Sequence, residues 1–251
     1  MKKYVQEATD INIWTSIKNN TFGRNKDIKE FIDGLELIDE SACISLDAKW
    51  GDGKTFFVRQ IEEVLKYVLA NQRADEENPI EKIPSYEYLK DNEMMAKIDL
   101  KHSYLPIYYN AWMYDNHSDP LMSLLLVMTK TCKGVYDTKI DSEKISEKLI
   151  KALSTLPISL GEFKMNPFTV AEKLQVKKVD ILSLVQTEEE IRERVKGIFN
   201  DIIVERAQKL IIFIDELDRC RPSFAIEMLE RIKHYFDDER VIFVVSLNKE
   251  Q

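Results

Sequence analysis

Residues 48–55 read A-K-W-G-D-G-K-T, and the rest of the sequence is most easily interpreted from this stretch. It matches the phosphate-binding pattern G-x-x-x-x-G-K-[ST] except at the first position, where Ala48 replaces glycine. An apolar run precedes it at residues 42–46, and residues 55–69 place apolar side chains on one face of a helix. Because a P-loop lies between a strand and a helix, the stretch predicts such a loop; the alternative is a Gly-Lys turn that binds nothing.

The residue types in this loop, the Walker A motif, suit ATP with Mg²⁺. Gly51 and Gly53 let backbone N–H groups close around phosphate oxygens with no side chain in between. Lys54 brings a positive charge to the β- and γ-phosphates, and Thr55 offers a hydroxyl to Mg²⁺. The residues expected to contact the nucleotide are Ala48, Lys49, Trp50, Gly51, Asp52, Gly53, Lys54, Thr55 and Phe56.

A second motif follows the apolar run L-I-I-F-I at residues 210–214, where residues 215–219 read D-E-L-D-R. Ligands bind at the carboxyl ends of parallel strands, so this run delivers two carboxylates to the edge where the loop is expected. We expect Asp215, as the Walker B acid, to hold Mg²⁺ and Glu216 to orient and deprotonate the attacking water. The alternative is that the two acids cap the next helix.

Four apolar runs rich in β-branched or aromatic residues are predicted as strands. They are residues 42–46, 105–109, 210–214 and 241–246. At least the first, third and fourth are continuous rather than alternating, as in parallel strands that are covered on both faces. Helical patterns at residues 55–69 and 222–235, and a helix from Thr187 to about Ala207, separate them. The fold class is therefore α/β: a P-loop NTPase with a mainly parallel sheet, flanking helices and a helical insertion between Walker A and Walker B.

The organisation of the chain fits one such domain over residues 1–251 with two insertions. Residues 71–104 are largely acidic and polar and are interrupted by prolines, which indicates a long surface loop. Residues 133–207 form the expected helical insertion. Gln251 follows the fourth strand closely, where a doubly wound sheet would continue, so we expect the domain to be C-terminally truncated.

Composition limits the classes of partner. The net charge of −8, with both signs mixed along the chain, does not support nucleic-acid binding. No apolar run approaches the ~20 residues of a membrane span, and no signal peptide is evident, so a cytoplasmic protein is expected. Cys43 and Cys220 flank apolar runs and are expected to be buried, reduced thiols. The histidines match no metal-ligand spacing.

The sequence resembles the KAP family of P-loop NTPases. The shared motifs are FGRNKDI at 22–28, WGDGKT at 50–55, NAW at 110–112 and FIDELDRCRP at 213–222. This resemblance implies an ATPase core in which Asp215 binds magnesium, Glu216 is catalytic and Asn248 takes the sensor position. Many members carry transmembrane helices in the insertion, whereas this chain has no apolar segment of that length there.

Asn248 and the arginines have two interpretations each. Asn248 follows the fourth strand, where it would hydrogen-bond the γ-phosphate or the water, or else cap the next helix. Arg219 is the first candidate for an arginine that reaches the γ-phosphate, with Arg24 and Arg221 behind it; alternatively, Arg219 pairs with Asp218 or Glu216.

The two tryptophans near these motifs, Trp50 and Trp112, are expected to be packing residues rather than to stack on adenine.

The leading functional hypothesis is an ATP-hydrolysing switch module of a larger protein, with bacterial antiphage defence or signalling as the setting that the resemblance suggests. The alternative is a module that holds nucleotide to fix assembly and does not hydrolyse it; the presence of Glu216 speaks against that. A small-molecule kinase would need an acceptor pocket, for which no motif is present. Expected partners, besides ATP, are further copies of the chain or other domains of the same protein.

Overall fold

The computed structural model divides into two compact units. The residues described are 7–74, 80–117, 120–135, 193, 196–197, 199–200, 207–235 and 238–249. The first unit comprises Met1–Asn110, Arg206–Arg219 and Glu239–Gln251, and the second comprises Ala111–Glu205 and Cys220–Asp238.

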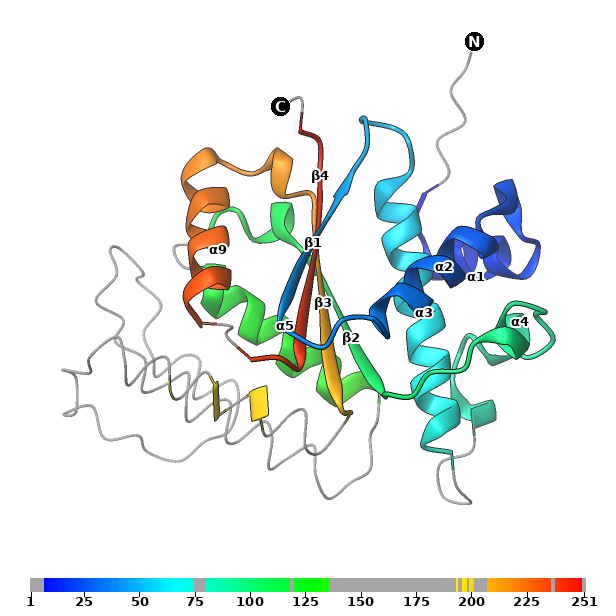
Figure 1. The fold of residues 1–251 in the computed structure, drawn as a ribbon. Helices are drawn as coiled ribbons and strands as arrows, with labels where there is room; N and C mark the ends of the chain where they lie inside the picture. Colours follow the sequence, from blue (N-terminus) through cyan, green and yellow to red (C-terminus); the bar gives the residue numbers. More distant parts are fainter. Residues whose placement is uncertain are drawn as a thin grey trace, which may run out of the picture. The chain divides into compact units, whose positions relative to one another are not determined.

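The first unit is built on a four-stranded parallel sheet (Figure 1). Its strands are β1 (Ala42–Asp47), β2 (Tyr104–Asn110), β3 (Lys209–Asp215) and β4 (Val241–Leu247), in the order β1-β4-β3-β2. Each contains its predicted run and extends it by one residue at one or both ends. The predicted α/β P-loop fold class is therefore confirmed, and the carboxyl ends of all four strands meet at one edge of the sheet.

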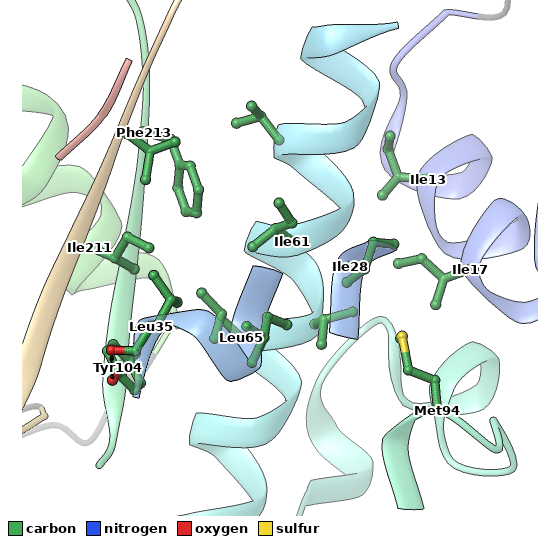
Figure 2. Packing of buried hydrophobic residues seen from close by; sticks show 14 of the residues in the cluster. Ile13, Ile17, Ile28, Leu35, Ile61, Leu65, Met94, Tyr104, Ile211 and Phe213 are labelled. Carbon is green, nitrogen blue, oxygen red and sulfur yellow. Dashed lines mark hydrogen bonds between the residues drawn. The ribbon is translucent and has the colours of Figure 1, made fainter. Parts of the chain in front are cut away.

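The core of this unit lies between the sheet and three helices. The helices are α1 (Asp10–Lys18), α2 (Asn25–Leu35) and α3 (Lys54–Gln72), and α3 lies against the sheet with α1 and α2 packed on it (Figure 1). Figure 2 shows Ile61 of α3 between Phe213 of β3 and the α1 side chains. Each such side chain, fully buried, stabilises the fold by roughly 1.5–3 kcal/mol. This packing fixes where α3, and the loop before it, meet the sheet.

The segment expected as a surface loop, residues 71–104, is partly structured. It contains η2 (Ile80–Lys82), α4 (Tyr86–Leu89) and η3 (Met95–Lys97), and α3 continues to Gln72. Leu89 and Met94 are buried in the same core cluster as the residues of α3 (Figure 2 shows Met94). These elements span at most four residues each, too few to show a helical period in the sequence.

The strand β1 differs from the expectation of burial on both faces. Its residues alternate between half-buried and exposed positions, and Cys43 is exposed. The prediction that Cys43 is buried is therefore wrong, because β1 is an edge strand and Cys43 lies on its exposed side. Cys220 is half-buried.

In the second unit, η4 (Ala111–Tyr114) leads to α5 (Pro120–Val135), which packs on α9 (Pro222–Tyr235). Arg221 immediately precedes α9, and its backbone N–H donates to the Asp115 carboxylate at 2.9 Å. No helix in the described part of the chain is long and apolar enough to span a bilayer.

The predicted helical insertion, residues 133–207, lies almost entirely outside the described residues. Its first three residues, 133–135, belong to α5, and the described positions 193, 196, 197, 199 and 200 are also helical, whereas 207 is not.

Candidate functional site

The P-loop connects the end of β1 to the start of α3. Gly51 and Gly53 have φ of +88° and +80°, in the left-handed region that glycine adopts without strain. Among the described non-glycine residues only Asn20, Phe22 and Glu216 have positive φ. Ala48, the one departure from the P-loop pattern, is thus in a conformation that needs no glycine.

Lys54 is turned onto the loop in this structure. Its ammonium donates to the carbonyl oxygen of Ala48 and lies 3.4 Å from that of Lys49. The Asp52 carboxylate accepts the Lys49 backbone N–H at 3.1 Å, which closes the loop on itself. The loop is therefore held in a compact conformation by its own polar groups.

Arg24 lines the cavity beside the same loop and contacts it directly. Its Nη2 donates to the Asp52 carbonyl at 2.8 Å, and its Nη1 donates to the Gly53 carbonyl at 3.1 Å. A Cβ placed on Gly53 would come within 3.1 Å of this guanidinium. The Arg24 guanidinium thus contacts backbone oxygens of the loop, and the FGR segment is anchored to the P-loop.

Asp215, at the end of β3, is 1% exposed and is oriented from two sides. The Tyr108 hydroxyl donates to its Oδ2 at 3.0 Å, and the Glu216 backbone N–H donates to its Oδ1 at 3.0 Å. Burial raises the pKa of Tyr108, and the charge of Asp215 raises it further, so the hydroxyl stays a donor. Sequence reasoning missed Tyr108. The available signal was a tyrosine, whose hydroxyl needs a hydrogen-bond partner when buried, two residues before the end of a predicted strand.

Glu216 combines an unusual backbone with a surrounded carboxylate. Its φ is +61°, a conformation that costs a non-glycine residue about 1–3 kcal/mol. Nη1 of Arg219 lies 2.9 Å from each carboxylate oxygen, and the Asn110 side chain forms a further hydrogen bond. Burial raises the pKa of Glu216; the charge of Arg219 opposes this, and Asp215 and Asp218 add to it.

Asn110 reaches Glu216 because it ends β2 and pairs in register with Asp215 on β3. The sequence contained Asn110 in the NAW motif, but the pairing of the two strands was needed to place it beside the acids.

A cavity of about 640 Å³ in the first unit brings these groups together. Its lining includes loop residues 49–56, the acids Asp215 and Glu216, Arg219 and the N-terminal residue Phe22. Phe22 is 89% exposed and was also missed, since nothing in its sequence context separates it from a core aromatic residue. Ala48 lines a smaller neighbouring cavity.

The expected metal ligands suit magnesium. Thr55 and Asp215 both line the larger cavity, and both offer the oxygen donors that Mg²⁺ prefers. Among the described residues, no group of three or more His, Cys, Asp and Glu side chains could form a metal cluster. A magnesium ion held here would complete its coordination with phosphate oxygens and water, as is usual for this ion.

The remaining candidates separate into those inside and outside the cavity. Arg219 pairs with Glu216, one of the two interpretations left open by the sequence, and its guanidinium carbon lies 4.5 Å from the Trp50 ring centroid. Arg221 contacts Asp115 in the second unit. Asn248 follows β4, the neighbour of β3 as expected, but is not among the residues that line the cavity.

The two tryptophans are not buried. Trp50 is 62% and Trp112 56% exposed. That both residues pack on protein groups rather than stack on adenine stays a prediction. Trp50 packs on a guanidinium because it lies on the loop, outside the core.

Comparison with known families finds a match to the family described as "KAP family P-loop domain" over residues 24–251, which is all but the first 23 residues of the chain. No curated protein matches this chain.

Proposed function

Because this chain belongs to the KAP family of P-loop domains, we propose that it binds ATP with Mg²⁺ and hydrolyses it as a nucleotide-dependent switch. Membership of the family makes the chain a nucleotide-binding module of the P-loop NTPase class. The adenine base, the magnesium dependence and the hydrolysis are the proposed part. A role in defence or signalling belongs to the same proposal and rests on the family alone.

One observation carries the proposal: a single cavity is lined by the P-loop, by Asp215 and by Glu216. A triphosphate in the loop would give the Lys54 ammonium a charged acceptor in place of the backbone carbonyls it now contacts. Thr55 and Asp215 would hold Mg²⁺, which neutralises charge on the phosphates. Glu216 would accept the proton of the attacking water.

A second candidate function is the assembly module that binds nucleotide without turnover. It is favoured by the ion pair between Arg219 and Glu216, because a carboxylate held by a guanidinium at 2.9 Å is a weaker base. The two functions make different predictions for turnover. A wild-type chain that binds ATP and releases no phosphate would establish the second.

Titration calorimetry of ATP, ADP and GTP, with and without Mg²⁺, tests the proposed function. We expect magnesium-dependent binding of ATP that is tighter than that of GTP and is lost in Lys54→Ala. The control is Lys26→Ala, because the Lys26 side chain is 80% exposed and pairs with the surface residue Glu30. ATP affinity unchanged in Lys54→Ala, with Lys26→Ala also unchanged, would remove the P-loop assignment.

A further inference from the structure

Three side chains form a continuous contact from the P-loop to the candidate base. Trp50 lies on the loop, and the guanidinium carbon of Arg219 is 4.5 Å from its ring centroid. Nη1 of the same guanidinium is 2.9 Å from both oxygens of Glu216. All three residues line the same cavity, so the contact is part of the candidate site.

Arginine is suited to the middle position of this contact. Its planar guanidinium can stack on an indole with its face while its edge donates to a carboxylate, whereas the lysine ammonium is a point charge. A guanidinium over a tryptophan ring is attracted by the negative face of the ring, and more strongly where the contact is desolvated. The Arg219 side chain is 34% and the Glu216 side chain 14% exposed, so the ion pair is only partly screened by solvent.

Glu216 is a residue whose position needs outside support. Its φ of +61° is a conformation that persists only where the surroundings hold it. A general base must lie within hydrogen-bond reach of the proton it removes, and a misplacement of 1 Å costs roughly 100-fold in rate. Arg219 and Asn110 both bond its carboxylate.

The P-loop end of the contact is sensitive to a ligand. The Lys54 ammonium now donates to the backbone carbonyls of Ala48 and Lys49, the two residues directly before Trp50. Transfer of that ammonium to a phosphate would release these carbonyls and change the backbone that carries the indole.

We propose that Trp50 and Arg219 are positioning residues for Glu216, so that occupation of the P-loop is transmitted through the indole and the guanidinium to the carboxylate. This inference rests on the proposed function, since it takes Glu216 as the base. The direction of the effect follows from the contacts: the two residues hold the base in place, and their removal lowers the rate of the chemical step.

The first test needs no turnover. The fluorescence of Trp50 is obtained by subtracting the emission of the same chain carrying Trp50→Phe, and its quenching by acrylamide is then measured. Arg219→Gln uncovers one face of the indole, and Glu216→Ala removes the anchor of the guanidinium, so quenching of Trp50 is expected to rise in both. Arg221→Gln, whose guanidinium contacts Asp115 in the other unit, is the control. Unchanged quenching in Arg219→Gln and Glu216→Ala would overturn the proposal.

The second test uses steady-state ATP hydrolysis. We expect Trp50→Leu and Arg219→Gln each to lower kcat roughly 10- to 100-fold while KM changes little, since the base is displaced and the phosphate contacts remain. Trp50→Phe keeps an aromatic face and should retain most of the activity, and Trp112→Leu is the control outside the cavity. The double variant Trp50→Leu/Arg219→Gln should be no slower than the slower single variant, because the two residues act through one contact.

The outcomes distinguish failure of this inference from failure of the proposed function. A higher kcat in Trp50→Leu or Arg219→Gln, or effects that multiply in the double variant, overturns the positioning role alone. Normal turnover in Glu216→Gln removes Glu216 as the base, and with it both proposals. A wild-type chain that binds ATP without turnover also removes both proposals. Increased quenching of Trp50 in Arg219→Gln and Glu216→Ala would then show only that the three side chains are in contact.

Discussion

The hydroxyl of Tyr108 on β2 donates to Oδ2 of Asp215 on β3 at 3.0 Å, across two neighbouring strands. The guanidinium carbon of Arg59, on α3, lies 4.8 Å from the centroid of the Tyr108 ring. Arg59 is in turn bonded to Asp10 at 2.8 Å and to the buried Glu62. The candidate metal ligand is therefore oriented by groups on a different strand and on the helix that follows the P-loop.

Tyr108→Phe should weaken the response of nucleotide binding to Mg²⁺. The substitution leaves Oδ2 of the buried Asp215 without its donor, which costs about 1–3 kcal/mol and frees the carboxylate to rotate. We expect the Mg²⁺ concentration for half-maximal ATP affinity to rise about 10-fold, while binding without Mg²⁺ is unchanged. Calorimetry across a magnesium series measures both.

The control is Tyr88→Phe, at a tyrosine that packs on Trp14 with ring centroids 5.6 Å apart, away from the acids. It should leave the magnesium dependence as in the wild type. An equal change in the two variants would mean that Tyr108 acts through packing and not through its hydroxyl.

Gly53→Ala should destabilise the chain and weaken nucleotide binding together. Gly53 has φ of +80°, and an added Cβ would lie 3.1 Å from two nitrogens of the Arg24 guanidinium. The left-handed conformation alone costs a non-glycine residue about 1–3 kcal/mol, and Arg24 must also move. We expect a loss of that size in the free energy of unfolding by urea, and loss of tight ATP binding.

Gly34→Ala is the matched control, because Gly34 lies in α2 and an added Cβ there meets nothing within 4 Å. It should leave binding unchanged and stabilise the chain by up to about 1 kcal/mol. A stable, nucleotide-binding Gly53→Ala chain would contradict the conformation of the loop seen here.

Arg24→Ala should distinguish an anchor of the loop from an arginine that assists catalysis. Because the guanidinium donates to the carbonyls of Asp52 and Gly53, we expect weaker binding of both ADP and ATP. An arginine acting on the γ-phosphate would leave ADP affinity intact and lower kcat by ~10³–10⁵. Calorimetry with both nucleotides, beside a turnover assay, separates the two; ADP affinity equal to the wild type excludes the anchor.

The parts of this fold that the sequence predicted are those that depend on neighbouring residues. The strand β3 is buried along its whole length and β4 at all but its last residue, which is why both read as largely apolar runs, and the P-loop lies in eight consecutive positions. The exposed side of β1 was not predicted, since an edge position depends on the order of strands in the sheet.

The parts that were missed depend on strand pairing. Tyr108 and Asn110 reach Asp215 and Glu216 only because β2 pairs with β3, about a hundred residues away along the chain. The contact of Arg219 with Trp50 joins two motifs that lie still farther apart in the sequence. The two motifs predicted that Asp215 and Glu216 would lie beside the P-loop. They carried no information about which side chains hydrogen-bond the two carboxylates.

Glu216→Gln should keep ATP affinity and lose turnover, and the wild-type pH profile should show why. Burial raises the pKa of Glu216 above its usual value near 4.3, with Asp215 and Asp218 adding to the rise against the opposing charge of Arg219. A base works only when deprotonated, so kcat should fall as pH decreases through this raised pKa, at a higher pH than for an ordinary glutamate. The control is Glu87→Gln, since the Glu87 side chain is 71% exposed and pairs with Lys90 at the surface. Phosphate release by Glu216→Gln at the wild-type rate would mean that another group accepts the proton, because an amide cannot.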